Sequence, residues 1–234
     1  MPGFDRVFVW AGGALFVASL ALTAWWYLIV LGRALPFTGW TPLLIDMALF
    51  SVFAAHHSVF AREGVKRSVA MVIPGGLLRS LYVWTASVLL MLVCLLWQPV
   101  GGEVFADRGV RAVAHVLTQL FGVWLIVQSV RAIDPLDLAG IRQPAAAAER
   151  VTKGPALQVG GVYQIVRHPL YCGWIVAVLG HPHMTGDRLA FAAITTFYLV
   201  IAIPWEERSL TAEFGDQYRR YQQRVRWRVV PYLY

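Results

Sequence analysis

Polar side chains that could do chemistry gather at four places along an otherwise apolar sequence. Each place lies in or beside a hydrophobic run, where ionisable groups are costly to bury and are functional candidates by default. Their chemistry depends on whether the four groups converge in the folded chain. The groups are His56, His57 and Ser58; Arg79 and Tyr82; Arg167, His168 and Tyr171; and Glu206 and Glu207.

Haem or metal ligation is one chemistry that histidines in such segments can perform. A haem clamped by two histidines needs both at the same depth, whereas His57 and His115 are separated by about 20 Å of helix rise. His181 and His183 form only a His-x-His pair, which favours a turn at the membrane surface over a zinc site. We therefore predict no metal site. His56 and His57 point about 100° apart on a helix, so at most one faces a shared pocket, and a neighbouring span could instead satisfy either.

The composition indicates which kind of element must position these groups. The 234 residues are 58% hydrophobic and 14% charged, with a mean hydropathy of +0.59, whereas a soluble domain carries about 25% charged residues. This excludes an ordinary cytosolic enzyme and a disordered chain. The two cysteines, Cys94 and Cys172, both lie in apolar segments and suggest no disulfide framework. The sequence therefore predicts an integral membrane protein.

Hydrophobic runs of about 20 residues predict transmembrane helices. Four such runs cover residues 7–31, 42–61, 77–97 and 112–130. Two shorter runs, 169–180 and 189–204, predict a helical hairpin that either crosses the bilayer or re-enters it. The expected fold class is an all-α polytopic bundle with five or six crossings. We expect one membrane domain over 1–234, with a four-span part (1–132) followed by a loop, the hairpin and a surface helix (133–234).

The surface helix is predicted for residues 205–224. Apolar side chains recur there at intervals of three or four, opposite basic ones, which is typical of an amphipathic helix on a membrane surface. Gly215 marks either a break or a close approach within it. The polar stretch 133–164 reads as a loop or lid. The apolar positions are Leu210, Phe214, Tyr218, Tyr221 and Val225.

The basic residues predict the orientation of the chain. The net charge is +7, and sixteen of the twenty Lys and Arg residues fall on one side of the predicted topology. The positive-inside rule places that side, with both termini, on the cytoplasmic side of the cell inner membrane. Basic residues between apolar runs suit anionic lipid headgroups rather than nucleic acid. All four polar groups then share a depth, so one cytoplasm-facing pocket is geometrically possible.

Three strings carry a resemblance to a known family. They are Arg-His-Pro-x-Tyr-x-Gly at 167–173, Glu-Glu-x-x-Leu at 206–210, and Phe-Gly-x-x-Tyr-x-x-Tyr at 214–221. In this order, with an apolar hairpin between them, they resemble the isoprenylcysteine carboxyl methyltransferase family of integral membrane enzymes. The string Asp-Leu-Ala-Gly-Ile-Arg-Gln at 137–143 and the turn at 182–186 resemble its methanethiol S-methyltransferase branch. Two departures are Ile133-Asp134-Pro135 in the loop and Val225-Arg226-Trp227-Arg228 in the tail.

The resemblance implies that S-adenosylmethionine is the cofactor and that the three strings bind it. Arg167 would meet the cofactor carboxylate or orient the substrate, and the thiol proton would pass to His168, His57 or Glu207. Metal is not implied. The cofactor-binding residues implied are Tyr163, Arg167, His168, Pro169, Tyr171, Gly173, Glu206, Glu207, Tyr218 and Tyr221.

We interpret the chain as a membrane methyltransferase that S-methylates a small thiol such as methanethiol, with membrane lipids as its surroundings. Methyl transfer from a sulfonium needs positioning and desolvation of the nucleophile, which a site at the membrane surface supplies. One alternative is carboxyl or amine methylation of a lipid-like substrate. An alternative of another class is a haem- or metal-binding accessory or transport protein. The sequence leaves the oligomeric state open.

Overall fold

The computed structural model describes residues 3–60, 65, 68–69, 71, 77–133, 135–141 and 157–234. Two compact units make up the chain. Unit 1 consists of residues 1–33, 38–100 and 135–155, and unit 2 of residues 34–37, 101–134 and 156–234. Several basic residues of the predicted cytoplasmic side lie outside the described residues, namely Arg62, Lys66, Arg67, Arg142, Arg150 and Lys153.

Unit 1 contains three of the predicted spans. They are α1 (Gly3–Trp25), which continues as the π-helix η1 (Trp26–Val30), α2 (Thr41–Phe60) and α4 (Leu78–Leu96). Helix α4 packs against both α1 and α2. These bounds agree with the predicted runs to within a few residues, because the length of an apolar run is set by the thickness of the bilayer.

Small and polar side chains join α1 to α4. The Trp84 indole donates a hydrogen bond to the Phe8 carbonyl at 3.1 Å, and a Cβ at Gly12 would lie 2.7 Å from the same indole nitrogen. Helices in lipid pack through such small residues and interhelical hydrogen bonds, since apolar contact alone is equally available from lipid. The short helix α6 (Pro135–Leu138) belongs to this unit, and the chain after it accepts a bond at Gly140 from the Ser80 hydroxyl at 3.0 Å.

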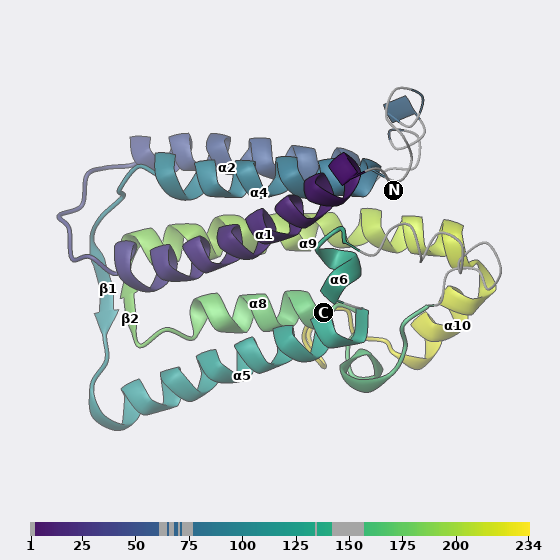
Figure 1. Cartoon of the computed structure of the whole chain (residues 1–234). Coiled ribbons are helices and arrows are strands. Elements are labelled where there is room, and N and C mark those ends of the chain that lie inside the picture. Colours follow the sequence, from purple (N-terminus) through teal and green to yellow (C-terminus); the bar gives the residue numbers. More distant parts are fainter. Residues whose placement is uncertain are drawn as a thin grey trace. The chain divides into compact units, whose positions relative to one another are not determined.

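Unit 2 contains the fourth span and the hairpin. Its elements are β1 (Glu103–Ala106), α5 (Gly109–Ile133), the 3-10 helix η2 (Gly161–Gln164), α8 (Pro169–Leu179), β2 (His183–Thr185), α9 (Gly186–Phe214) and α10 (Asp216–Arg224). Helices α5 and α8 lie side by side (Figure 1). Their backbones touch where two glycines meet: a Cβ at Gly173 would lie 2.8 Å from the Gly122 carbonyl oxygen.

A two-stranded antiparallel sheet ties the tip of the hairpin to the start of α5. Strand β2 pairs with β1, with Phe105 opposite Met184. At the other end of the hairpin, η2 packs against α5. The chain from η2 through α8 to β2 therefore runs along α5 from one end to the other. This favours a hairpin that crosses the bilayer, although α8 alone has only 11 residues. The sheet was not predicted, because strands this short leave no periodic signal.

The predicted surface helix is divided differently. Helix α9 continues through Pro204 to Phe214, since a proline is tolerated in a membrane helix when neighbouring groups satisfy the freed backbone. Gly215, at a φ of 53° that favours glycine, ends α9. Helix α10 follows and is amphipathic as predicted, with Tyr218 and Tyr221 buried. Gly215 is thus a break, which was one of its two interpretations.

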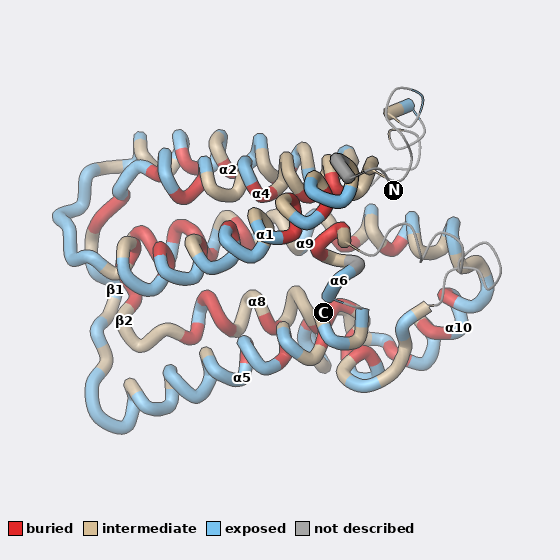
Figure 2. Tube along the Cα trace, viewed as in Figure 1, coloured by how far each residue is buried: buried red, intermediate tan, exposed pale blue. Residues whose placement is uncertain are grey.

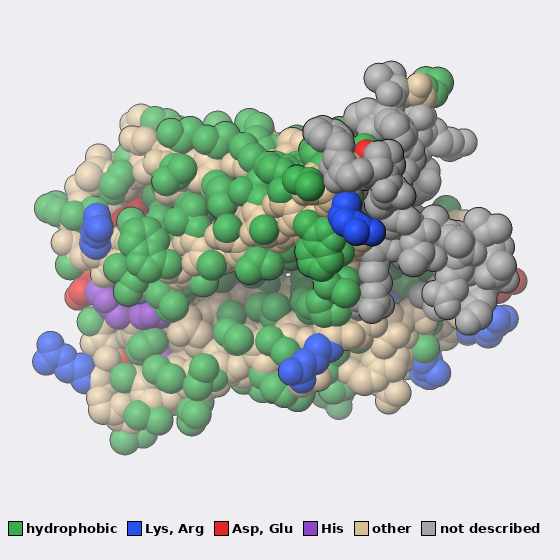
Figure 3. Space-filling model, in the orientation of Figure 1, with side chains coloured by type: hydrophobic (Ala, Val, Ile, Leu, Met, Phe, Trp, Pro, Cys, Tyr) green, Lys and Arg blue, Asp and Glu red, His purple; other side chains and the backbone are tan. Residues whose placement is uncertain are grey.

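The surface of the helices is apolar. Among the residues that the structure describes, five helices are long and apolar enough to cross a membrane, and exposed faces run along them (Figure 2). Hydrophobic side chains cover the visible lengths of these helices (Figure 3). In water such surfaces would aggregate, and in lipid they are solvated. The all-α polytopic fold class is confirmed, and the protein is an integral membrane protein.

Candidate active site

Glu207 lies at the centre of a polar cluster in unit 2 and binds three cationic or imidazole groups. Its Oε1 accepts from Arg167 Nε at 2.7 Å and lies 3.4 Å from His168 Nε2. Its Oε2 accepts from Arg228 Nε at 3.2 Å. The Glu207 side chain is 7% exposed. A carboxylate buried this deeply needs such partners, because an unpaired buried charge is very costly.

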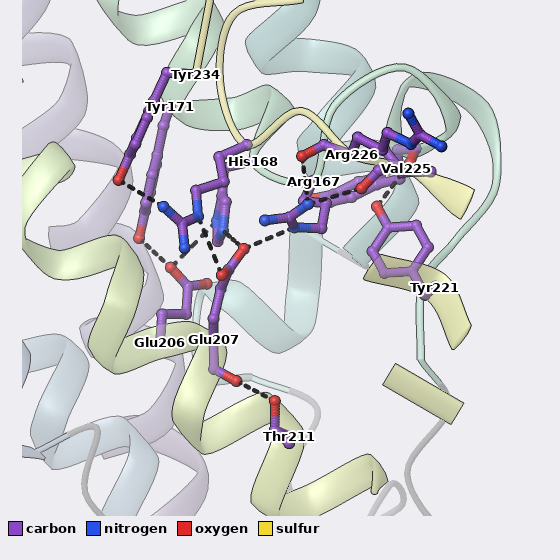
Figure 4. Close-up of polar contacts among 12 residues, drawn as sticks. Arg167, His168, Tyr171, Glu206, Glu207, Thr211, Tyr221, Val225, Arg226 and Tyr234 are labelled. Carbon is purple, nitrogen blue, oxygen red and sulfur yellow. Dashed lines mark hydrogen bonds and ion pairs between the residues drawn. The ribbon is translucent and has the colours of Figure 1, made fainter. Parts of the chain in front are cut away.

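Arg167 ties this carboxylate to the end of the chain. Its Nη1 donates to the carbonyl oxygens of Val225 and Arg226, both at 2.7 Å (Figure 4). The backbone continues the link, since the Arg167 amide donates to Trp227 O at 2.9 Å and the His168 amide to Arg228 O at 2.8 Å. The guanidinium is therefore occupied by protein groups, and the segment from Val225 onward is an integral part of the site.

Glu206 is the accessible carboxylate of the pair. Its side chain is 42% exposed. Its Oε2 accepts from the Tyr171 hydroxyl at 2.7 Å and lies 3.5 Å from His168 Nδ1. The rings of His168 and Tyr171 stack, with centroids 5.3 Å apart (Figure 4). One carboxylate is thus satisfied inside the protein, while its neighbour is held by two aromatic residues and faces outward.

The start of helix α8 explains how the string at 167–173 places His168 and Tyr171 side by side. Pro169 begins the helix, where its missing N–H would have no partner in any case. Tyr171 follows in the first turn, beside His168, which precedes the helix. Gly173 lies against Gly122 of α5. Gly173 therefore serves helix packing, and its predicted contact with a cofactor stays a prediction.

The tyrosines of α10 form a small core on the same unit. Tyr218 and Tyr221 are buried with Val225. Burial raises the pKa of Tyr221 to about 12, so its hydroxyl stays protonated and donates to the Tyr163 carbonyl oxygen at 2.6 Å. Burial also raises the pKa of Tyr218, whose hydroxyl has no hydrogen-bond partner within the described residues. These contacts anchor α10 next to Glu207, whose charge also raises the pKa of Tyr218.

The remaining predicted site residue, His57, lies in unit 1. Its Nδ1 is 2.5 Å from the Tyr82 hydroxyl, and the ring of His56 stacks on the same tyrosine with centroids 5.5 Å apart. The four polar groups of the sequence therefore fall in two units, two groups in each. The convergence of His57 with Arg167 and Glu207 in a single pocket stays a prediction.

The two histidines of the His-x-His pair are engaged by protein groups at the other end of unit 2. His181 Nδ1 accepts from the His183 amide at 3.0 Å and lies 3.1 Å from Arg188 Nη1. His183 Nε2 lies 3.0 Å from Glu103 Oε2. In the described part of the chain, no three His, Cys, Asp or Glu side chains are arranged to hold a metal ion.

An open groove adjoins Glu207 and has a volume of ≈ 370 Å³. Ligand sites of a few hundred Å³ are common for small cofactors. Two guanidinium groups and an amide line it, which suits a ligand with a carboxylate and hydroxyl groups. The lining residues are Pro204, Glu207, Arg208, Thr211, Gln222 and Arg228.

Arg228 is the site residue that the sequence did not single out. It belongs to none of the three strings, and a lone arginine in a basic tail reads as surface charge. Its Nη1 also donates to the Tyr234 hydroxyl at 3.2 Å, and its guanidinium lies 5.1 Å from the centre of that ring. Only the return of the tail to His168 brings Arg228 to Glu207, and that return leaves no local signal in the sequence.

Taken together, these features define a polytopic α-helical membrane protein with a buried polar cluster. Residues 110–217 match the phospholipid methyltransferase family. The methanethiol S-methyltransferase 2 of Bradyrhizobium diazoefficiens is 39% identical over 186 residues, which cover 78% of this chain and 71% of that protein.

Two further relatives agree with this class. The methanethiol S-methyltransferase of Pseudomonas deceptionensis is 37% identical over 191 residues, which cover 78% of this chain and 71% of that protein. The protein-S-isoprenylcysteine O-methyltransferase B of Arabidopsis thaliana is 41% identical over 68 residues, which cover 28% of this chain and 34% of that protein. No solved structure matches the chain.

The chain belongs to the family of integral membrane methyltransferases that contains these proteins. It is a methyltransferase, as the motif strings at 167–173 and 206–221 predicted.

Proposed function

We propose that the chain transfers the methyl group of S-adenosylmethionine to the sulfur of a small apolar thiol such as methanethiol, at the cytoplasmic face of the inner membrane. The similarity to the methanethiol S-methyltransferases over most of the chain supports the acceptor. The observation that carries the proposal is the contrast between the two glutamates. The charge of Glu207 is paired inside the protein, whereas Glu206 is held by Tyr171 and is accessible.

The residues of unit 2 fit this cofactor. Glu206 offers an accessible carboxylate to an ammonium group or to ribose hydroxyls, and Tyr171 holds it in place. Arg208, which lines the groove beside Glu207, suits the carboxylate of the cofactor better than Arg167 and Arg228, whose guanidinium groups already donate to protein groups. S-adenosylmethionine supplies an electrophilic methyl group on a positively charged sulfur.

The protein must accept one proton in this reaction, because a thiol becomes a nucleophile only as its thiolate. The S–H bond breaks, a new S–CH₃ bond forms, and the products are a thioether and S-adenosylhomocysteine. Among the predicted acceptors, Glu207 already has three partners on its oxygens. We therefore assign the proton to the pair of His168 and Glu206, which share a contact of 3.5 Å.

Two measurements test the proposal. Isothermal titration of the purified protein with S-adenosylhomocysteine should show binding that the substitution Glu206→Ala weakens. Methyl transfer from labelled S-adenosylmethionine should label methanethiol in preference to a prenylcysteine or phosphatidylethanolamine. A protein that binds no S-adenosylhomocysteine contradicts the cofactor, and labelling of the lipid alone contradicts the thiol.

A second acceptor class is favoured by one observation. The match to the phospholipid methyltransferase family runs from α5 to the start of α10, so amine methylation of a phospholipid is the alternative interpretation of the same site. The panel of acceptors above separates the two, because only one of them predicts a labelled lipid.

A further inference from the structure

A second groove in unit 2 lies away from Glu207, at the end of α5 that faces η2. Its volume is ≈ 510 Å³. One wall is the last turns of α5, and the other is the segment that leads through η2 toward Arg167. The groove residues used below are Trp124, Gln128 and Arg131 from α5 and Gln158, Val162 and Ile165 from the second wall.

The chemistry of this groove changes along α5 from apolar to cationic. Trp124, Gln128 and Arg131 are spaced by four and three residues and so lie on one face of the helix. The same face continues with Phe121 and Leu117, which are 52% and 61% exposed. The rings of Phe121 and Trp124 contact each other, with centroids 5.7 Å apart. From Leu117 to Arg131 this stripe is about 20 Å long, at 1.5 Å of rise per residue.

The place of the stripe on α5 indicates its depth in the bilayer. Helix α5 is apolar and long enough to span a membrane, and Arg131 lies in its last turn. The apolar part of the stripe therefore lies at the depth of acyl chains, with Trp124 about 10 Å from the arginine along the helix. Arg131 is exposed and lies at the depth of the phosphate groups.

We propose that this groove binds one anionic phospholipid, with its phosphate at Arg131 and one acyl chain along Trp124, Phe121 and Leu117. A guanidinium pairs with a phosphate through two parallel hydrogen bonds. The amides of Gln128 and Gln158 supply further donors at the same end of the groove. A free phosphate would leave the apolar stripe without a partner, whereas a phospholipid satisfies both ends.

The second wall gives the bound lipid a structural consequence. Val162 and Ile165 belong to the segment that runs directly into Arg167 and His168. The Tyr221 hydroxyl holds this segment from α10, through the carbonyl of Tyr163. A lipid in the groove would contact Val162 and Ile165 from the side of α5. It would therefore pack against the same segment that Tyr221 holds from the side of α10. The lipid is bound and not methylated, so the proposal does not depend on the methyl acceptor.

Native mass spectrometry of the purified, delipidated full chain tests the proposal directly. Dioleoylphosphatidylglycerol is titrated into the wild-type protein, into Arg131→Gln and into Arg111→Gln. The last variant is the matched control, since Arg111 is also on α5 but at its other end, beside Asp107. We expect one tightly held lipid in the wild type and in Arg111→Gln. Affinity should fall about fivefold in Arg131→Gln, as expected from ~1 kcal/mol per basic residue at an anionic surface.

Two further arms distinguish the source of the phosphate. The substitution Ile165→Asp, which places a carboxylate in the groove, should also weaken phosphatidylglycerol binding, while dioleoylphosphatidylcholine should bind more weakly than phosphatidylglycerol to the wild type. Glycerol phosphate should not displace the lipid at equal concentration. Equal retention by the wild type and Arg131→Gln, or displacement by glycerol phosphate, would overturn the proposal.

Discussion

At the scale of residues, two adjacent glutamates on α9 have different surroundings. The Glu207 side chain is 7% exposed, and its carboxylate contacts Arg167, His168 and Arg228. Glu206 is 42% exposed and is held by Tyr171. Adjacent residues on a helix point about 100° apart, so a Glu-Glu pair can present one carboxylate to the interior and the other to a ligand.

The substitution Glu206→Gln tests the accessible carboxylate. It keeps the size of the side chain and removes its charge, so we expect the protein to fold and methyl transfer to fall about 100-fold. Methyl transfer is measured with saturating thiol, together with the affinity for S-adenosylhomocysteine. The control is Glu213→Gln, an exposed glutamate further along α9. An unchanged kcat/KM for S-adenosylmethionine in Glu206→Gln would refute the assignment of Glu206 to the cofactor site.

The substitution Arg167→Ala tests the buried carboxylate. It removes a partner of Glu207 and the ties to Val225 and Arg226. Breaking a buried pair by removing one partner costs about 3–5 kcal/mol, so the melting temperature in detergent should fall sharply. Arg219→Ala, which removes an exposed pair with Asp216, should change stability by less than about 1 kcal/mol. Equal melting temperatures for the two variants would contradict this.

At the scale of elements, close packing of α8 on α5 places the Arg-His-Pro string. Gly122 and Gly173 let the two backbones touch, and β1 with β2 fixes the opposite end of the hairpin. The segment after α10 then closes the site through the amides of Arg167 and His168. The site therefore depends on contacts between elements far apart in the sequence.

The substitution Gly173→Ala tests this packing. A Cβ there would lie 2.8 Å from the Gly122 carbonyl oxygen and 2.9 Å from the Ile126 amide nitrogen, both backbone atoms that move only with the helix. We expect a loss of about 1–3 kcal/mol, as for other overpacked interiors, measured by thermal unfolding. Gly160→Ala is the control, because its nearest neighbour lies 3.6 Å away and is a side-chain atom. Destabilisation of both variants to the same extent would argue against the close contact.

The turn at the tip of the hairpin should make stability depend on pH. Burial and the charge of Arg188 lower the pKa of His181 from 6.5 to about 4. The unfolded chain therefore binds a proton that the folded chain refuses between these values, and stability falls as the pH drops from about 6.5 toward about 4. Melting curves at about pH 7.5 and about pH 5 should show a larger decrease for the wild type than for His181→Asn. Identical pH dependence would contradict the shift.

At the scale of the whole molecule, the distribution of charge predicts an orientation. Helix α9 is an apolar helix of 29 residues. It carries β2 at one end and α10 at the other. If the basic side is cytoplasmic, the sheet lies on the far side of the membrane and the Glu206 site lies on the near side.

Labelling of single cysteines tests this orientation. In a background with Cys94→Ala and Cys172→Ala, a membrane-impermeant maleimide should label Val104→Cys in intact spheroplasts, since Val104 is 53% exposed in β1. Gln223→Cys on α10 should react only after permeabilisation. The reverse pattern would place the site on the other side.

The sequence alone was sufficient for the membrane class and for the spans. A run of 20 apolar residues has few alternatives in a bilayer, because its backbone must satisfy itself as a helix. The strings at 167–173 and 206–210 contain polar side chains that the structure brings into one cluster, namely Arg167, His168, Tyr171, Glu206 and Glu207. Their part in binding a cofactor or in catalysis stays a prediction.

The tertiary structure decided how those side chains divide their roles. It showed that the charge of Glu207 is paired with arginines while Glu206 stays accessible. It also showed that Gly173 packs on α5 and that Arg228 belongs to the cluster. None of these could be read from local patterns, since burial and pairing depend on which distant segments meet. A carboxylate has the same sequence signal whether two guanidinium groups and an imidazole surround it or none does, and only the fold distinguishes the two cases.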